Sequence, residues 1–425
     1  MLQNSHFFSF LITFLLENKE IILEKLTLDT VYDAKNVLSK IARTTSLTHS
    51  NYLSTKNNVF LKTENLQLTG SFKLRGAYYK ISKLSDEEKT KGVIACSAGN
   101  HAQGVALAAK EKGIKATIFM PLTAPISKVE ATRSYGAEIK LIDGVYDDAY
   151  QEAIKYQQET GATFIHPFDD TDVIAGQGTI ALEIYEQLND VDAIVIPIGG
   201  GGLISGVAAT IKQIKPSCKV YGVQASGADS MYESLKKQER VELKQVNTFA
   251  DGTAVKLPGE LTYQYCLDYV DEIVTVEEDE IASAVLTLIE KEKMISEGSG
   301  ALPVAAVKFD KIPLSDKNIV CLVSGGNIDV NILSRVINKA LIKTGRISYL
   351  TIELLDKPGQ LRDVSTIIAN HGANVIRVRH NQGGKGTAIN ECYLNIVIET
   401  RNFEHFQTII NALKDAGYNN ITTKE

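Results

Sequence analysis

The sequence predicts an α/β protein with a second, smaller unit at its C-terminal end. Two patterns support this prediction. From about residue 29, short and almost wholly apolar runs alternate with stretches of helical spacing, and strands of that kind lie in parallel sheets covered by helices on both faces. After residue 343 the order changes to strand, helix, strand, strand, helix, strand, which is the order of a ferredoxin-like plait.

The composition restricts the class of function. The chain has 425 residues, of which 44% are hydrophobic and 23% charged, and its net charge is −6. These values are typical of a soluble globular protein with two or three domains, and the negative charge argues against a nucleic-acid-binding surface. The five cysteines include no C-x-x-C pair, so we expect a reducing cytoplasm and neither a disulfide framework nor a zinc site.

Residues 1–28 are predicted to form an N-terminal extension. Residues 7–16 are a nearly continuous apolar run, too short to span a bilayer, without basic residues before it or a small-residue cleavage site after it. We therefore expect neither a membrane anchor nor a signal peptide. The run is either a docked helix or an extension without a part in the chemistry.

The larger domain is predicted to span residues 29–343, with a smaller subdomain at about 92–170. Helical patterns such as 147–160 and 278–293 separate its strands, and ligands of such sheets bind beyond the carboxyl ends of the strands. The loops that follow strands are therefore the candidate sites. The predicted strands are residues 59–62, 92–96, 116–120, 138–142, 163–166, 193–198, 219–224, 272–276 and 318–323.

A lysine stands at the start of a predicted helix. A glycine turn at 69–72 leads into Lys73 and a stretch of helical spacing. The positive end of the helix dipole and neighbouring Arg75 both disfavour the charged amine, which makes it a better nucleophile. A solvated surface lysine is the commoner case, so this interpretation depends on the loops further along the chain.

The first loop of unusual composition is Ser97-Ala98-Gly99-Asn100-His101, which follows the strand ending at residue 96. Its small residues let the backbone approach a ligand, and the free N–H groups of the new helix favour an anion such as a carboxylate. His101 by itself is more often a locally bonded histidine than a catalyst.

The second loop is Gly199-Gly200-Gly201-Gly202, between strand 193–198 and a predicted helix from Leu203. Consecutive N–H groups at a helix start form a phosphate cradle. A nucleotide is disfavoured because neither G-x-G-x-x-G nor G-x-x-x-x-G-K-[ST] occurs here. A third loop, at 324–327, places the hydroxyl of Ser324 at the end of another strand, although a lone Ser-Gly-Gly is weak evidence.

A lysine, a phosphate cradle, a carboxylate loop and a lone hydroxyl together indicate a pyridoxal phosphate site that holds an amino acid. Over about residues 29–343 the chain resembles the fold-type II pyridoxal-phosphate enzymes, whose tryptophan synthase β-like fold has two α/β subdomains, and most closely the serine/threonine dehydratases. The motifs that carry the resemblance are TGSFKLRGA from residue 69, SAGNHAQG at 97–104, AGQGT at 175–179, GGGGLISG at 199–206, DGTAVKLPGE at 251–260 and SGGN at 324–327.

The resemblance implies a role for each segment. Lys73 would carry the cofactor as a Schiff base and remove the α-proton of the substrate, while Phe72 would pack against the ring. Asn100 would bond the phenolic oxygen, and Ser324 would face the pyridine nitrogen. The phosphate would be held by Gly199, Gly200, Gly201, Gly202 and Leu203, and the substrate by Ser97, Ala98, Gly99, Asn100 and His101.

The implied reaction is the α,β-elimination of L-threonine to 2-oxobutanoate and ammonia, and of L-serine to pyruvate. A serine beside the pyridine nitrogen leaves that nitrogen neutral, which disfavours a long-lived carbanion and suits elimination. Serine racemisation is less favoured, because Ala98 stands where racemases carry a second serine. Gln224 and Ser230 replace the acidic ligands of the racemase metal site, so no required metal is expected there.

The C-terminal unit, residues 344–425, resembles the ACT regulatory domain. A first helix is predicted to end at Asn370 and a second to span residues 403–416, and a flexible turn is expected at 381–386. The predicted strands are 348–355, 374–380, 393–399 and 420–424. Open sheet edges predict at least a homodimer, and the resemblance implies a homotetramer with an amino-acid or nucleotide effector. The implied effector residues are Asp356, Pro358, Gly359, Gln360, Leu361, Asn374 and Val375.

Several alternatives remain at this stage. The chain could be a serine racemase, or a β-replacement enzyme such as cysteine synthase, or threonine synthase, or an amino-acid sensor without catalytic activity, and the C-terminal unit could be a structural tail. The ACT-like unit and the TGSFK-x-RGA motif argue against the synthases. The sequence does not distinguish threonine from serine as the preferred substrate, a role in isoleucine biosynthesis from a degradative one, or one effector from another.

Overall fold

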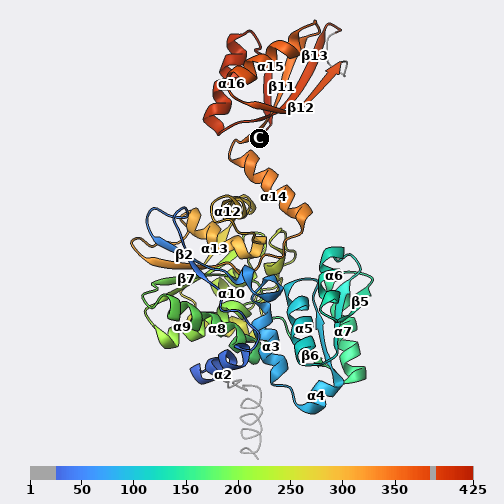
Figure 1. Ribbon diagram of the computed structural model, residues 1–425, viewed down its shortest axis with the longest axis vertical. Coiled ribbons are helices and arrows are strands. Elements are labelled where there is room, and N and C mark those ends of the chain that lie inside the picture. The colour runs from blue at the N-terminus through green and yellow to red at the C-terminus, as the bar shows by residue number, and fades with distance from the viewer. Residues whose placement is uncertain (1–24, 383–388, 425) are drawn as a thin grey trace, which may run out of the picture.

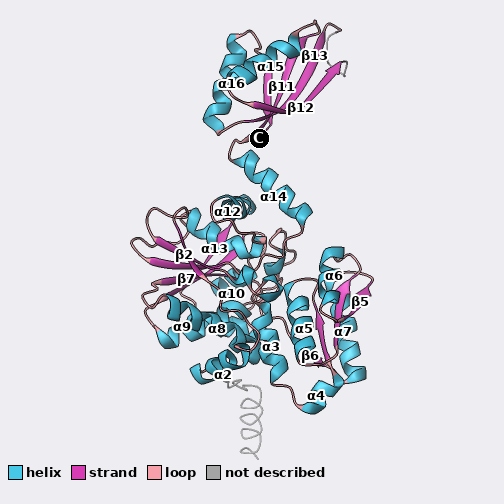
Figure 2. Ribbon diagram, viewed as in Figure 1, coloured by secondary structure: helices cyan, strands magenta, loops and turns pink. Residues whose placement is uncertain are grey.

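The computed structural model describes residues 25–382 and 389–424, which form three sheets covered by helices (Figures 1 and 2). The apolar run at 7–16 and most of the predicted N-terminal extension lie outside the described residues. In the described part of the chain, no helix combines the length and the apolar character needed to cross a bilayer.

The largest sheet has six strands in the order β1-β2-β10-β7-β8-β9. All neighbours are parallel except β1, which pairs antiparallel with β2. The central strands are apolar on both faces. Val195 packs on one side with α12 (Glu278–Glu290) and α13 (Gly298–Lys308). Ile194 and Ile196 pack on the other side with α8 (Thr171–Gln187) and α9 (Gly202–Ile214). The strands are β1 (Leu47–Ser50), β2 (Asn58–Lys62), β7 (Ala193–Pro197), β8 (Lys219–Ala225), β9 (Glu272–Val276) and β10 (Asn318–Leu322).

Strand β1 was not predicted from the sequence. Its residues Thr48 and His49 are exposed, so it lacks the apolar run by which the other strands were found. Its pairing with β2 at the edge of the sheet defines it as a strand, and short polar strands are typical of such edges.

The second sheet forms the smaller subdomain, with four parallel strands in the order β5-β4-β3-β6. Helices α3 and α5 contribute to the core on one face, and α7 covers the other. Strand β6 is two residues long, shorter than the predicted 163–166. The strands are β3 (Val93–Cys96), β4 (Ala116–Pro121), β5 (Glu138–Ile142) and β6 (Thr163–Phe164).

Most helices of these two subdomains follow the predicted α/β alternation. The helices are α2 (Leu28–Leu38), α3 (Lys73–Ser82), α4 (Asp86–Lys91), α5 (Asn100–Glu111), α6 (Ile126–Ser134), α7 (Tyr146–Thr160), α8 (Thr171–Gln187), α9 (Gly202–Ile214), α10 (Ser230–Lys237), α11 (Glu260–Tyr269), α12 (Glu278–Glu290), α13 (Gly298–Lys308) and α14 (Val330–Lys343).

The C-terminal unit stands apart from the other two sheets and is joined to them through α14 (Figure 1). Its antiparallel strand order, β12-β13-β11-β14, is that of a ferredoxin-like plait, as predicted. Two helices pack on one face of the sheet. The elements are β11 (Ile347–Leu355), α15 (Gln360–Asn370), β12 (Asn374–Gln382), β13 (Glu391–Glu399), α16 (Phe403–Asp415) and β14 (Ile421–Lys424).

The predicted turn at 381–386 needs a correction. Asn381 and Gln382 belong to β12, because they pair with Tyr393 and Cys392 of β13. The rest of the predicted turn, residues 383–386, lies outside the described residues.

Candidate active site

Lys73 is the first residue of α3, as predicted. Its Nζ atom donates a hydrogen bond to the carbonyl oxygen of Pro167 at 2.8 Å. Removal of the amine from water lowers its pKa to about 8, and the charge of Glu297 opposes this shift. The amine is therefore much closer to its neutral, nucleophilic form at physiological pH than an ordinary lysine.

The cause of this shift differs from the prediction. Arg75 was expected to lower the lysine pKa by its positive charge, but its guanidinium is neutralised by two buried carboxylates, those of Glu64 and Glu183. Burial of the lysine amine has the largest effect on its pKa.

The glycine loop at 199–202 packs against residue 168, next to the proline that accepts the hydrogen bond from Lys73. Phe168, the neighbour of Pro167, packs so closely on this loop that a Cβ atom added to Gly200 would lie 2.3 Å from its ring. A Cβ atom on Gly202 would lie 2.8 Å from the Phe168 backbone, and Gly201 has a φ of +98°. The loop therefore requires glycine for space and for conformation, and residues 167–168 join it to Lys73.

The glycine loop also begins a helix. Gly201 is the N-cap of α9, and the helix starts at Gly202, one residue before the predicted Leu203. No side chain caps this end, so backbone N–H groups of the first turn remain for an anion. Thr262 holds the loop in place, since its Oγ1 donates a hydrogen bond to the carbonyl oxygen of Gly200 at 2.6 Å.

The loop at 97–101 meets the loop at 324–327 through an amide chain. Asn100 Nδ2 donates to Glu297 Oε1 at 2.7 Å, and Asn327 Nδ2 lies 2.8 Å from Asn100 Oδ1. The same Asn327 Nδ2 is 2.6 Å from the carbonyl oxygen of Thr69, at the turn before the lysine. The structure thus brings together three segments that the sequence analysis selected separately.

Ser324 and Phe72 are neighbours in space. The backbone N–H of Phe72 donates to the Ser324 carbonyl at 3.1 Å, and Ser71 pairs with Gly325 in an isolated bridge. Ser324 is buried. The residue before the lysine and the predicted partner of the pyridine nitrogen are therefore adjacent.

His101 is buried, and its Nε2 lies 2.7 Å from the carbonyl oxygen of Ile165. Burial and the charge of Lys73 lower its pKa to about 3, so the ring is neutral. This is the locally bonded histidine that the sequence analysis weighed as the commoner case. The backbone N–H of His101 is therefore the group of this residue that could contact a substrate, because the ring already bonds to Ile165.

Glu297 is a site residue that the sequence analysis missed. It is 4% exposed, and burial, with the nearby charge of Asp251, raises its pKa to about 7. Glu297 is the N-cap of α13 and follows no strand, so it lies outside the strand-end loops that were the candidate sites in the sequence. Its small-residue surroundings, Ser296 and Gly298, were the available signal.

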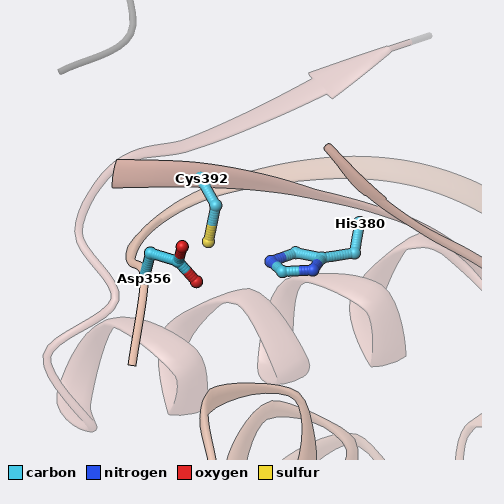
Figure 3. Close-up of side chains that lie close together, drawn as sticks. All are labelled: Asp356, His380 and Cys392. Atoms are coloured by element: carbon cyan, nitrogen blue, oxygen red, sulfur yellow. The ribbon is translucent and has the colours of Figure 1, made fainter. Parts of the chain in front are cut away.

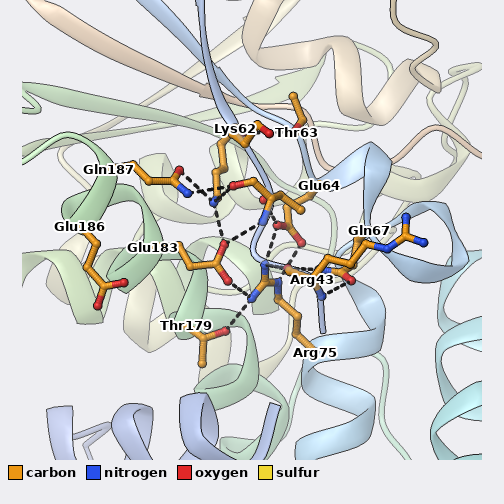
Figure 4. Close-up of polar contacts among 12 residues, drawn as sticks. Arg43, Lys62, Thr63, Glu64, Gln67, Arg75, Thr179, Glu183, Glu186 and Gln187 are labelled. Carbon is orange, nitrogen blue, oxygen red and sulfur yellow. Dashed lines mark hydrogen bonds and ion pairs between the residues drawn. The ribbon is translucent and has the colours of Figure 1, made fainter. Parts of the chain in front are cut away.

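A buried ionic network holds the lysine-bearing helix in place (Figure 4). Arg75 contacts Glu64 at 2.8 Å and Glu183 at 2.6 Å, and Lys62 contacts Glu183 at 2.6 Å. These charges come from β2, the turn after β2, α3 and α8, so the network fixes α3 against the large sheet.

The residues of this site fit pyridoxal phosphate. The desolvated amine of Lys73 bonds to Pro167, and the next residue, Phe168, packs on the glycine loop. In that loop added side chains would collide, and N–H groups of the first helical turn are available for a phosphate. Two buried hydroxyl oxygens of the lysine-bearing turn, Thr69 Oγ1 and Ser71 Oγ, have no hydrogen-bond partner in the described structure. Unpartnered buried polar groups beside a reactive amine are expected where a polar ligand binds.

Gln224 and Ser230, the two residues that stand where acidic metal ligands would be needed, take part in hydrogen bonds within the protein. Gln224 Nε2 donates to the carbonyl oxygen of Ala228 at 3.1 Å, and its Oε1 accepts from the N–H of Tyr232 at 2.8 Å. Ser230 Oγ donates to the Val255 carbonyl at 2.8 Å.

The predicted effector residues lie at opposite ends of the C-terminal sheet. Asp356 follows Leu355, the end of β11, and Gly359 is the N-cap of α15 with a φ of +96°. Asn374 pairs with Glu399, the partner of Ile347 at the start of β11. One chain therefore does not bring Asp356 and Asn374 together.

The chain is similar to known proteins over most of its length. The family described as "Pyridoxal-phosphate dependent enzyme" matches residues 38–325. An L-threonine ammonia-lyase of Thermotoga maritima is 49% identical over 397 residues, covering 92% of this chain and 98% of the relative. A Staphylococcus aureus protein named L-threonine dehydratase catabolic TdcB is 48% identical over 321 residues, covering 74% of this chain and 93% of the relative.

A solved structure agrees with these relatives. The processed form of threonine deaminase isoform 2 from Solanum lycopersicum has a TM-score of 0.71 and 42% sequence identity, covering 74% of this chain and 88% of that one. The family match includes the lysine turn, the glycine loop and Ser324. The chain therefore belongs to the pyridoxal-phosphate dependent enzymes.

Proposed function

We propose that this chain is an L-threonine ammonia-lyase that releases 2-oxobutanoate and ammonia from L-threonine, and pyruvate and ammonia from L-serine. The observation that carries the proposal is the hydrogen bond from Lys73 to Pro167, whose neighbour Phe168 packs on the glycine loop. The similarity to the Thermotoga maritima L-threonine ammonia-lyase over nearly the whole chain supports this choice of reaction.

Pyridoxal phosphate would be held at both ends. Lys73 would attach it covalently, and the N–H groups of Gly199 to Leu203 would bind its phosphate. Asn100 would bond the phenolic oxygen, with Phe72 against the ring and Ser324 beside the pyridine nitrogen. When bound, the cofactor supplies an electron sink that makes the α-proton of the amino acid acidic.

Lys73 then acts as the base at its Nζ atom. A pKa near 8 suits a general base, because the neutral amine can accept the α-proton and the ammonium form can then lose that proton to water near physiological pH. Glu297 stabilises the protonated amine by its charge, and it holds Asn100 by a hydrogen bond. The loop at 97–101 would orient the substrate carboxylate through its N–H groups.

The assay that tests this proposal measures ammonia and 2-oxo acid after incubation of the purified protein with L-threonine. Release of both products in equal amounts is the expected result. D-serine formed from L-serine without ammonia would favour the racemase, a sulfide-dependent product the cysteine synthase, and absence of any product the sensor. Parallel kinetics with L-serine would establish which substrate is preferred.

We further propose that the C-terminal unit is an ACT-type regulatory domain that works as a pair. If β12 of two copies pairs antiparallel about a two-fold axis, Asp356 of one copy approaches Asn374 of the other, which brings the separated effector residues together. Exposed Ile376 and Val378 on β12 support such a contact. A homodimer or homotetramer, in a reducing cytoplasm that suits the five free cysteines, is the proposed form.

Titration of activity against isoleucine, valine and AMP tests the regulatory proposal. Inhibition by isoleucine would indicate a biosynthetic role, and activation by the nucleotide a degradative one. An enzyme that responds to none of the three while its C-terminal unit is intact would support a structural tail instead.

A further inference from the structure

Asp356, His380 and Cys392 form a cluster in the C-terminal unit, outside the proposed active site. One ligand-type atom of each side chain lies within 4.8 Å of the other two. Figure 3 shows the carboxylate, the imidazole and the thiol turned toward one another. Among the described residues, no second group of three such side chains meets this condition.

The fold brings the three residues together from β12, β13 and the residue that follows β11. Cys392 lies on β13, where it pairs with Leu354 of β11 on one side and with Gln382 of β12 on the other. His380 precedes Gln382 by two residues, so both side chains extend to the same face of β12. Asp356 follows the end of β11 directly. This juxtaposition depends on strand register, which explains why no cysteine spacing in the sequence announced it.

The burial of the cluster suits the capture of an ion from solvent. Cys392 is 1% exposed and forms the floor, whereas Asp356 and His380 are exposed and leave a path of entry. Gln382 Nε2 donates to Asp356 Oδ2 at 2.7 Å. A bond of this kind orients a carboxylate that serves as a metal ligand.

We propose that Asp356, His380 and Cys392 bind one divalent transition-metal ion of the zinc class. Thiolate and imidazole ligands favour zinc, cobalt or nickel, whereas magnesium and calcium require oxygen ligands. Around a tetrahedral zinc ion the ligand atoms lie about 3.5 Å apart. Side-chain rotations that move each ligand atom by about 1 Å would therefore bring the three atoms to zinc-binding distance. The thiol proton is released to solvent on binding, and the fourth position stays open for water or a small ligand.

The ion would connect the ends of β11, β12 and β13. It would therefore stabilise the plait at the end that also carries the loop from Asp356 to Leu361, because a ligand that binds only the folded state favours it. The proposal concerns binding alone, so it does not depend on the reaction catalysed at Lys73.

Calorimetric titration of the full-length, tag-free holoenzyme tests the proposal, after chelation and removal of the chelator. With ZnCl₂ we expect one high-affinity ion per chain, and with MgCl₂ no binding at this site. His380→Asn and Cys392→Ser should each weaken zinc binding at least about tenfold. His49→Ala, which removes an exposed histidine on β1, is the matched control and should leave the affinity unchanged.

His380→Asn is the decisive variant because His380 is exposed. Cys392→Ser alters a buried position and could disturb the fold. Zinc affinity equal to that of the unaltered chain in His380→Asn would overturn the proposal, as would a stoichiometry well below one. Titration with CoCl₂ adds a second measurement. A thiolate-to-cobalt absorption band that appears in the unaltered chain and is absent from Cys392→Ser is expected, and its persistence in that variant would assign the ion to another thiol.

Discussion

Asn100 Nδ2 donates a hydrogen bond to Glu297 Oε1 at 2.7 Å, and this bond joins the two subdomains across the site. Asn100 begins α5, which packs on the smaller sheet, whereas Glu297 precedes α13, which packs on the larger one. Lys73 begins α3, and the charge of Glu297 raises its pKa. The contact therefore couples the position of the predicted cofactor ligand to a carboxylate whose pKa is raised to about 7 by burial.

The first prediction concerns the pH dependence of cofactor attachment. Only the neutral amine of Lys73 attacks the aldehyde, and burial lowers its pKa to about 8. In the cofactor-free enzyme, the rate of attachment should therefore rise about tenfold per pH unit below 8 and level off above it. Stopped-flow absorbance of the bound cofactor at a series of pH values measures this profile.

Glu297→Gln provides the control for that profile. The charge of Glu297 raises the pKa of Lys73, so its removal should shift the midpoint to lower pH. Ionisation of free pyridoxal phosphate is the same in both experiments and cancels in the comparison. A midpoint near 10, or an identical midpoint in the two proteins, would contradict the assignment.

Lys73→Ala should abolish both turnover and the absorbance of the covalently attached cofactor. Loss of the base alone should reduce kcat by at least about 10³-fold, and loss of the covalent link removes the spectral band. Lys83→Ala, at the C-cap of the same helix and about half exposed, should retain both. An active Lys73→Ala protein that keeps the band would remove the whole assignment.

Gly200→Ala and Gly202→Ala should both weaken pyridoxal phosphate binding, and a second substitution should separate them. The new Cβ atom at Gly200 collides with the ring of Phe168, whereas the one at Gly202 collides with its backbone. Overpacking of this kind costs about 1–3 kcal/mol, or roughly 5- to 150-fold in affinity.

Phe168→Ala should therefore restore part of the affinity lost in Gly200→Ala and none of that lost in Gly202→Ala. Equilibrium titration of each cofactor-free variant with pyridoxal phosphate, and of Phe168→Ala alone, completes the cycle. Equal rescue of both glycine variants would show that the loop is not packed as described.

Arg75→Met should destabilise the fold strongly at neutral pH. It leaves Glu64 without its ion-pair partner and Glu183 with Lys62 as its remaining ion-pair partner. Loss of one member of a buried ion pair costs about 3–5 kcal/mol. Arg133→Met, in an exposed pair with Glu130, is the matched control, with an expected change within about 1 kcal/mol. Urea unfolding followed by circular dichroism gives both values.

The penalty of Arg75→Met should shrink at acidic pH. Burial favours the neutral acid of Glu183, but Arg75 and Lys62 outweigh it and hold its pKa below the ordinary value. In the unaltered chain this carboxylate contributes stability above its unfolded pKa of about 4.5, and that stability is lost as the pH falls through the depressed pKa. Without Arg75 the carboxylate of Glu183 protonates more readily, so the two proteins should differ less at pH 5 than at pH 8. A constant difference would refute this explanation.

The sequence determined the features that depend on local spacing and chain order. Apolar runs separated by helical patterns predicted the parallel strands, and small residues after strands 93–96, 193–197 and 318–322 marked three loops that lie around one site. Lys73 was correctly placed at a helix start, because the preceding turn and the helical pattern are both local.

Tertiary structure decided everything that depends on pairing, burial and distance. The polar strand β1 exists through its register with β2, Lys73 is desolvated rather than repelled by Arg75, and Glu297 gains its raised pKa from burial beside loops far away in the chain. Asp356, His380 and Cys392 meet because three strands pair in one register. Helix and turn preferences depend on residues that are close in the sequence, so the sequence predicts them. Contacts between distant residues form only when the chain has packed, so they require the tertiary structure.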